Sequence, residues 1–213
     1  MRSTMLDRDS RLRVAHTIEK DETQASIGVF RLLAQRGHLD GPPPTISDGL
    51  GGIDQAMLEV YGRVPEYGGR GRPPTRKQPG KEWLYLQMVK QRDPHGRFTG
   101  TKLKAVFGSK ENLVALLGGS TAYLERSNLT SRMFNGRQVR KTLAFSKDVD
   151  YCRFAAIWED AYYNLVKAHK GLRLRIHNCP DRKWRPRTPA MAADLTNHIL
   201  TVKELLTVIP IRC

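Results

Sequence analysis

The chain has 213 residues, a length that fits one domain of ordinary size with an appendage. Its 36 Lys and Arg outnumber its 21 Asp and Glu, so the formal net charge is +15 and a polyanionic partner is expected. No apolar run approaches the length of a membrane span, so we expect no membrane association and no signal peptide.

Strands and helices are predicted to alternate in the first part of the chain. A short extended run at 3–6, turn residues at 7–10 and an alternating run at 11–19 predict a β-hairpin. Apolar residues at helical spacing predict helices over 22–38 and 51–61. Between these helices, Thr45-Ile46 predicts a short buried strand that carries Asp48 at its carboxyl end.

The segment 63–81 differs in composition from the residues on either side of it. It contains six Arg or Lys, one acid and many Gly and Pro, which cannot bury a core and predict a mobile loop. The loop is either a solvated linker or a basic segment that lies along DNA and orders on binding. We favour the second interpretation because the excess of cations exceeds what solubility requires.

The remaining segments predict two more strands and then helices. Strands are expected at 83–89 and 97–107, followed by a helix from Ser109 to Leu117 and another from Thr121. An amphipathic helix is expected over 148–167, with its aromatic face in the core rather than stacked on bases; the members of that face are Phe154, Trp158, Tyr162 and Leu165. A basic tail at 173–187 precedes short helices at 190–193 and 196–206.

This order of elements predicts an α/β fold with one mixed sheet flanked by helices. The three cysteines, Cys152, Cys179 and Cys213, have no C-x-x-C spacing, which favours reduced thiols and a cytoplasmic location. His169 and His177 lie near Cys179, but their spacing matches no standard zinc ligand pattern, so no zinc site is expected.

Two carboxylates are candidates for phosphodiester chemistry. Glu125 heads a segment, 126–141, that has five Arg or Lys and no acid, and Asp48 ends a predicted strand. Acids from different elements can hold two Mg²⁺ ions ~3.5–4 Å apart beside a phosphate. Alternatively, Asp48 belongs to an ordinary Asp-Gly turn, and Glu125 is a first-turn helix charge or a surface partner of Arg126 or Arg132.

The sequence resembles insertion-sequence transposases of the DDE class, which have an RNase H-like catalytic domain. The resemblance covers about residues 4–206 and is most specific in the runs at 125–132 and 187–193. The runs that carry it are Ser47-Asp48-Gly49, 56–62, 125–132, 136–147, 158–165 and 187–193.

The resemblance implies Mg²⁺-dependent DNA cleavage and strand transfer at the ends of an insertion sequence. Two Mg²⁺ ions are expected, with Mn²⁺ as a substitute, and the family's second Asp and its Glu fall on Asp48 and Glu125. The implied partner is DNA, bound by a homo-oligomer in the nucleoid, with no small-molecule substrate. The expected DNA contacts are Arg70, Arg72, Arg76, Lys77, Arg126, Asn128, Arg132, Arg137, Arg140 and Lys141; Asn128 and Arg132 could also orient Glu125.

The family's first Asp has no counterpart here, because Asp7, Asp9 and Asp21 do not match its position. We therefore expect an N-terminally truncated transposase. Residues 1–146 would form the catalytic core without its first strand, with a basic insertion at 63–82, and 147–213 a helical region with a basic tail. The alternative is a catalytically dead DNA-binding remnant or a truncated inhibitor of an intact transposase. A ribosomal-type RNA binder would need stacking aromatics on a sheet face, and the sequence places none there.

Overall fold

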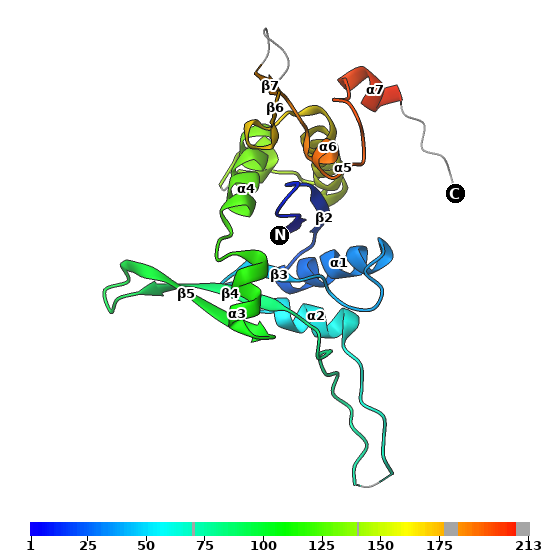
Figure 1. The fold of residues 1–213 in the computed structure, drawn as a ribbon, viewed down its shortest axis with the longest axis vertical. Helices are drawn as coiled ribbons and strands as arrows, with labels where there is room; N and C mark the ends of the chain where they lie inside the picture. The colour runs from blue at the N-terminus through cyan, green and yellow to red at the C-terminus, as the bar shows by residue number, and fades with distance from the viewer. Residues whose placement is uncertain (70, 140, 177–182, 208–213) are drawn as a thin grey trace. The chain divides into compact units, whose positions relative to one another are not determined.

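The computed structural model describes residues 1–69, 71–139, 141–176 and 183–207, and the α/β class predicted from the sequence is confirmed (Figure 1). The chain forms two compact units. The first contains Met1–Thr4 and Ala15–Glu125, and the second contains Met5–Val14 and Arg126–Cys213.

The predicted N-terminal hairpin is confirmed and contributes residues to both units. Strands β1 (Arg2–Leu6) and β2 (Arg13–Ile18) pair with each other. In the turn, the carboxylate of Asp7 accepts hydrogen bonds from the backbone N–H of Ser10, at 2.8 Å, and from its hydroxyl. The Ser10 hydroxyl in turn accepts from the N–H of Leu12 at 3.2 Å. This Asx-type turn sets where β2 begins.

The first unit is built around helices α1 (Glu22–Gln35) and α2 (Ile53–Tyr61), which pack against each other. Phe30 of α1 and Tyr61 of α2 meet edge to face at 6.3 Å, and Tyr61 meets Trp83 in the same way. At Gly28 of α1 a Cβ atom would lie only 2.8 Å from the Thr17 side chain, so glycine allows the hairpin to approach the helix.

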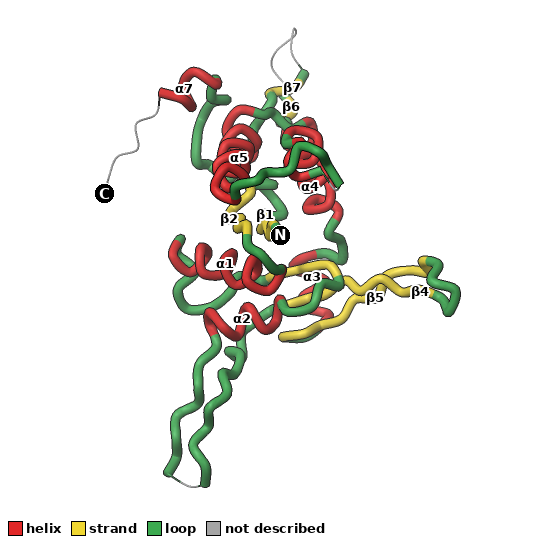
Figure 2. The backbone as a smooth tube through the Cα atoms, turned by 180° about the vertical axis from the view of Figure 1, so that it is seen from behind, coloured by secondary structure: helices red, strands yellow, loops and turns green. Residues whose placement is uncertain are grey.

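A three-stranded sheet completes this unit (Figure 2). Strand β3 (Thr45–Asp48) runs parallel to β4 (Tyr85–Arg92), and β4 is antiparallel to β5 (Phe98–Phe107). Helix α3 (Lys110–Leu117) packs on β4 and β5 through the fully buried Leu113. Its first turn is capped as predicted, since the Ser109 hydroxyl accepts from the N–H of Asn112.

The prediction of one mixed sheet is wrong. Within the described residues the strands form three separate sheets, β1–β2, β3–β4–β5 and the short pair β6 (Leu174–Arg175) with β7 (Trp184–Arg185). Alternating apolar residues identify strands, but they do not specify which strands pair. Strands β1 and β2 of the hairpin pair with each other, and among the described residues β3 pairs only with β4.

The second unit is mainly helical. Helix α4 (Ala122–Phe134) starts in the first unit and leads into a 3₁₀ turn, η1 (Gly136–Gln138). Helix α5 (Val149–Ala161) is capped by Asp148 and continues as a π-helical turn, η2 (Tyr162–Val166). A 3₁₀ turn η3 (Lys170–Leu172), helix α6 (Pro189–Ala192), capped by Thr188 as predicted, and a short α7 (Val202–Thr207) follow.

The predicted orientation of the aromatic face of α5 is also wrong. Phe154 is 64% exposed and Trp158 is 42% exposed, whereas Glu159 and Asp160 are buried. The other two members of the predicted core face, Tyr162 and Leu165, are half-buried. The helix is therefore rotated so that its acids face inward, where Glu159 and Asp160 pair with the buried Arg13.

Candidate functional site

Asp48 is the last residue of β3 and is exposed. Its carboxylate accepts a hydrogen bond from the N–H of Leu50 at 3.3 Å. The side chain of Gln87, on the neighbouring strand β4, donates to the carbonyl of Leu50 at 2.9 Å and ties this loop to the sheet. The strand end and its loop thus present the carboxylate to solvent from an anchored position.

Asp54, in the first turn of α2, is a nearby acid that the sequence analysis missed. Burial raises the pKa of the Tyr85 phenol, a hydrogen bond with Ser47 lowers this pKa, and the carboxylates of Asp54 and Asp48 raise it. The two carboxylates therefore both lie within electrostatic range of one phenol. The signal in the sequence was the placement of Asp54 at the start of the helix that directly follows the Asp48 loop.

Glu125 lies in the first turn of α4 and is exposed. Its carboxylate accepts from the hydroxyl of the buried Thr121 at 3.4 Å. Farther along the helix, Asn128 and Arg132 are also exposed, whereas Ser127 and Ser131 are buried. Residues at i, i+3 and i+7 share a face of a helix, so α4 presents Glu125, Asn128 and Arg132 outward.

The donor chemistry of Asp48 and Glu125 suits Mg²⁺. Both are carboxylates that reach solvent, and within the described residues both accept only from uncharged groups. Hard oxygen ligands of this kind are what Mg²⁺ binds, with waters completing its shell. The described residues hold no group of three or more His, Cys, Asp and Glu arranged around a metal position.

The basic loop after α2 has a defined base. Arg63 pairs with Gln78 through backbone hydrogen bonds. Arg72 and Arg76 are exposed, and Lys77 forms an ion pair with Glu59 at 3.2 Å. Arg70, another expected DNA contact, lies outside the described residues.

The basic residues in and after α4 are mostly at the surface. Arg126, Arg132 and Lys141 are exposed, and the Arg137 guanidinium donates to the Ser146 hydroxyl at 3.1 Å. Arg140 lies outside the described residues. These side chains leave cationic groups available to solvent, as a phosphate-binding surface requires.

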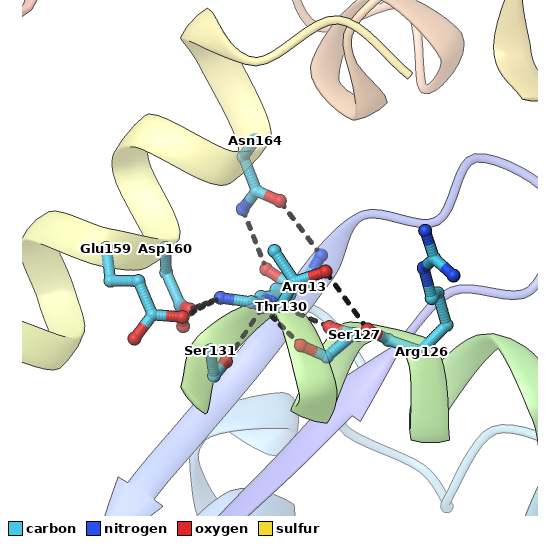
Figure 3. Close-up of polar contacts among 8 residues, drawn as sticks. All are labelled: Arg13, Arg126, Ser127, Thr130, Ser131, Glu159, Asp160 and Asn164. Carbon is cyan, nitrogen blue, oxygen red and sulfur yellow. Dashed lines mark hydrogen bonds and ion pairs between the residues drawn. The ribbon is translucent and has the colours of Figure 1, made fainter. Parts of the chain in front are cut away.

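A buried cation, Arg13, organises the second unit (Figure 3). Its side chain is fully buried and its Nη1 donates to Glu159 at 2.6 Å and to Asp160 at 2.7 Å. Its Nε donates to the hydroxyl of Ser127 at 2.8 Å. Its Nη2 donates to the carbonyl of Ser127 at 2.9 Å and to the hydroxyl of Ser131 at 2.8 Å. All five N–H donors of the guanidinium thus have partners.

Two further contacts fix the position of Arg13. Asn164 pairs with the Arg13 backbone, accepting from its N–H and donating to its carbonyl, both at 3.0 Å. The guanidinium also lies over the ring of Tyr163, 3.9 Å from the ring centre. Arg13 therefore joins the start of β2 to α4, to α5 and to the π-helical turn η2.

Arg13 was not among the residues predicted from the sequence, although one signal pointed to it. On β2, Arg13 lies two residues before the buried Ala15, and residues two apart on a strand point to the same face. The strand period therefore predicts that the Arg13 side chain is buried. A buried charge is stable only if it is paired with groups of opposite charge. The adjacent acids Glu159 and Asp160 supply them.

His169 is a second polar group inside this unit. Its ring packs edge-on against Tyr163 at 4.6 Å, and its Nε2 is buried with no hydrogen-bond partner among the described residues. The pKa of His169 is lowered to about 4, chiefly by burial and next by the neighbouring cation Lys167. Arg11 and Arg13 act in the same direction, against a hydrogen bond with the Tyr163 backbone. The imidazole is therefore neutral at pH 7.

Comparison with known proteins gives no assignment. No family model, curated protein or solved structure matches this chain. None of the described helices has both the length and the apolar character needed to cross a bilayer. Cys152 is a free, half-buried thiol, and His177, Cys179 and Cys213 lie outside the described residues.

Substitution of Arg13 should destabilise the second unit strongly. Arg13→Met removes the buried cation that pairs with Glu159 and Asp160, and we expect a loss of about 3–5 kcal/mol in the free energy of unfolding. The matched control is Arg8→Met in the same hairpin, because Arg8 is 45% exposed and pairs with the exposed Asp9. That control should cost less than about 1 kcal/mol. Urea denaturation measures both, and equal stability of the two variants would contradict the structural role of Arg13.

His169 should make stability fall in mild acid. The unfolded chain takes up this proton near the ordinary pKa of about 6.5, whereas folded His169 does so only near 4. Protonation between these values favours the unfolded state, so its contribution is intact above pH 6.5 and is lost as the pH falls toward 4. Urea midpoints from pH 7 to 4 should decline less steeply in His169→Gln than in the wild type. His95→Gln, in an exposed turn, should follow the wild type, and identical profiles for all three proteins would contradict the assignment.

Proposed function

We propose that this chain is the catalytic part of a DDE-class DNA transposase with an RNase H-like domain. It would cut DNA at the ends of a mobile element and transfer the strand. The observation that carries the proposal is the pair of solvent-facing carboxylates, Asp48 and Glu125, in a chain with a net charge of +15.

The connection around Asp48 supports this proposal. Strand β3, helix α2 and the parallel strand β4 form a β-α-β unit, and Asp48 stands at the carboxyl end of its first strand. In α/β proteins the carboxyl ends of parallel strands are where ligand-binding side chains collect. Asp54, in the first turn of α2, lies within electrostatic range of Tyr85, as Asp48 does.

Each group would have a distinct task in the reaction. Asp48 and Glu125 would hold the metal, and when bound, Mg²⁺ (or Mn²⁺) would polarise the phosphodiester and activate the attacking water or 3′-hydroxyl. Exposed cations such as Arg72, Arg76 and Arg132 would neutralise backbone phosphates and keep the strand near the carboxylates. We further propose that the protein acts as a homo-oligomer on DNA and is found in the cytoplasm, at the nucleoid.

Removal of either carboxylate should abolish cleavage and leave DNA binding intact. We expect Asp48→Asn and Glu125→Gln each to slow Mg²⁺-dependent nicking of a supercoiled plasmid by at least about 100-fold, which is ~2.7 kcal/mol of transition-state stabilisation. Binding should stay within about twofold, because phosphate contacts come from other side chains.

Matched controls are Asp40→Asn and Glu111→Gln, which remove exposed acids from the same unit. Both should nick like the wild type. Nicking that survives in Asp48→Asn and Glu125→Gln would overturn the assignment of the site. A wild-type chain that binds DNA but does not nick it with Mg²⁺ or Mn²⁺ would overturn catalysis by this chain and support the non-catalytic DNA-binding alternative.

A further inference from the structure

The outer part of the β4–β5 ribbon is strongly cationic. From Val89 to Lys102, beyond the residues of β4 that pair with β3, it has a single acid, Asp93, and four exposed basic side chains, Lys90, Arg92, Arg97 and Lys102. A fifth exposed cation, Lys104, lies opposite Gln87, where β3 also pairs. Asp93 is occupied in the turn, where its carboxylate accepts from the N–H of Arg97 at 2.8 Å.

The described residues do not neutralise these charges. Within the described part of the chain none of the five basic side chains forms an ion pair, and Arg92 donates only to the carbonyl of Gly96, at 2.7 Å. Like charges this close on one ribbon repel each other, and a polyanion would remove that repulsion.

The register distributes the cations over both faces of the ribbon. Residues directly opposite each other in an antiparallel pair share a face. Lys102 lies opposite Val89 and Lys104 opposite Gln87, so both lysines are on the Gln87–Val89 face. Lys90 lies opposite Thr101 and therefore points to the other face.

The base of the ribbon is anchored, whereas its outer end is free. Tyr85 and Leu86 at the start of β4 are buried, and α3 packs there through Leu113. Figures 1 and 2 both show the ribbon projecting beyond helices α2 and α3 of its own unit. Near the turn Phe98 is 61% exposed. The ribbon is thus a projecting two-stranded arm that carries charge along its length.

We propose that the β4–β5 ribbon is an arm that binds duplex DNA by entering a groove. The choice of DNA over another polyanion rests on the proposed function. The major groove of B-DNA is about 12 Å wide and accepts a two-stranded β-ribbon. Cations on both faces would then meet phosphates on both walls of the groove, and such contacts position the protein without reading the sequence.

The test is the salt dependence of DNA binding. Log K falls with log salt concentration, and each lost phosphate contact makes this negative slope shallower by about 0.9, so Lys90→Gln/Lys102→Gln should make it shallower by ~1.8. The matched control is Lys20→Gln/Arg31→Gln, which removes the same charge from exposed positions at or near α1. The control should keep the wild-type slope. Circular dichroism confirms that both variants remain folded.

A second measurement places the arm directly on the duplex. A photoreactive benzoylphenylalanine in place of Phe98 should crosslink to duplex DNA, and the same group in place of the exposed Leu39 should not. Equal slope changes in the two double variants, or no crosslink from position 98, would overturn the arm while nicking and its dependence on Asp48 and Glu125 still support the proposed function. A wild-type chain that does not bind duplex DNA, or an arm that crosslinks instead to an acidic protein, would overturn the choice of DNA.

Discussion

The buried ion cluster around Arg13 is the constraint on which the second unit depends. A guanidinium with a fully buried side chain is stable only if its donors and its charge are satisfied, and here two carboxylates, two serines and one aromatic ring do so. These partners come from α4, α5 and η2. One side chain of β2 therefore contacts all three of these elements. The same requirement turns Glu159 and Asp160 inward and leaves Phe154 and Trp158 in solvent.

The cluster also fixes the rotation of α4 about its own axis, and α4 carries Glu125 of the candidate site. Because Ser127 and Ser131 are held against Arg13, the opposite side of the helix is presented to solvent. That side carries Glu125, Asn128 and Arg132. One helix thus has a face that stabilises the fold and a face with the acid and the cation that we propose bind metal and DNA. Loss of Arg13 should therefore affect the exposed face indirectly, through the rotation of α4.

Local features were predictable from the sequence, and long-range ones were not. The hairpin turn, the strand that ends in Asp48 and the Ser109 and Thr188 caps all depend on neighbouring residues, and the structure contains them as predicted. The separation of the hairpin from β3–β4–β5 depends on strand pairing, which periodicity does not determine. The rotation of α5 does not follow from its aromatic stripe, because it depends on Arg13, a partner of Glu159 and Asp160 that lies far away in the sequence. For the candidate site, the sequence placed Asp48 and Glu125 on the correct elements. It did not reveal Asp54, because only the structure shows that Asp54 and Asp48 both lie within electrostatic range of Tyr85.

The central claim is that Asp48 and Glu125 hold the same metal centre. Fe²⁺ in place of Mg²⁺, with ascorbate and peroxide, generates radicals that cut the polypeptide backbone beside a bound ion. If the two carboxylates hold one ion, cuts should occur next to both Asp48 and Glu125, and Asp48→Asn and Glu125→Gln should each abolish both cuts. Cutting beside one of these residues that persists after the other is replaced, or no cutting at either position, would contradict this claim.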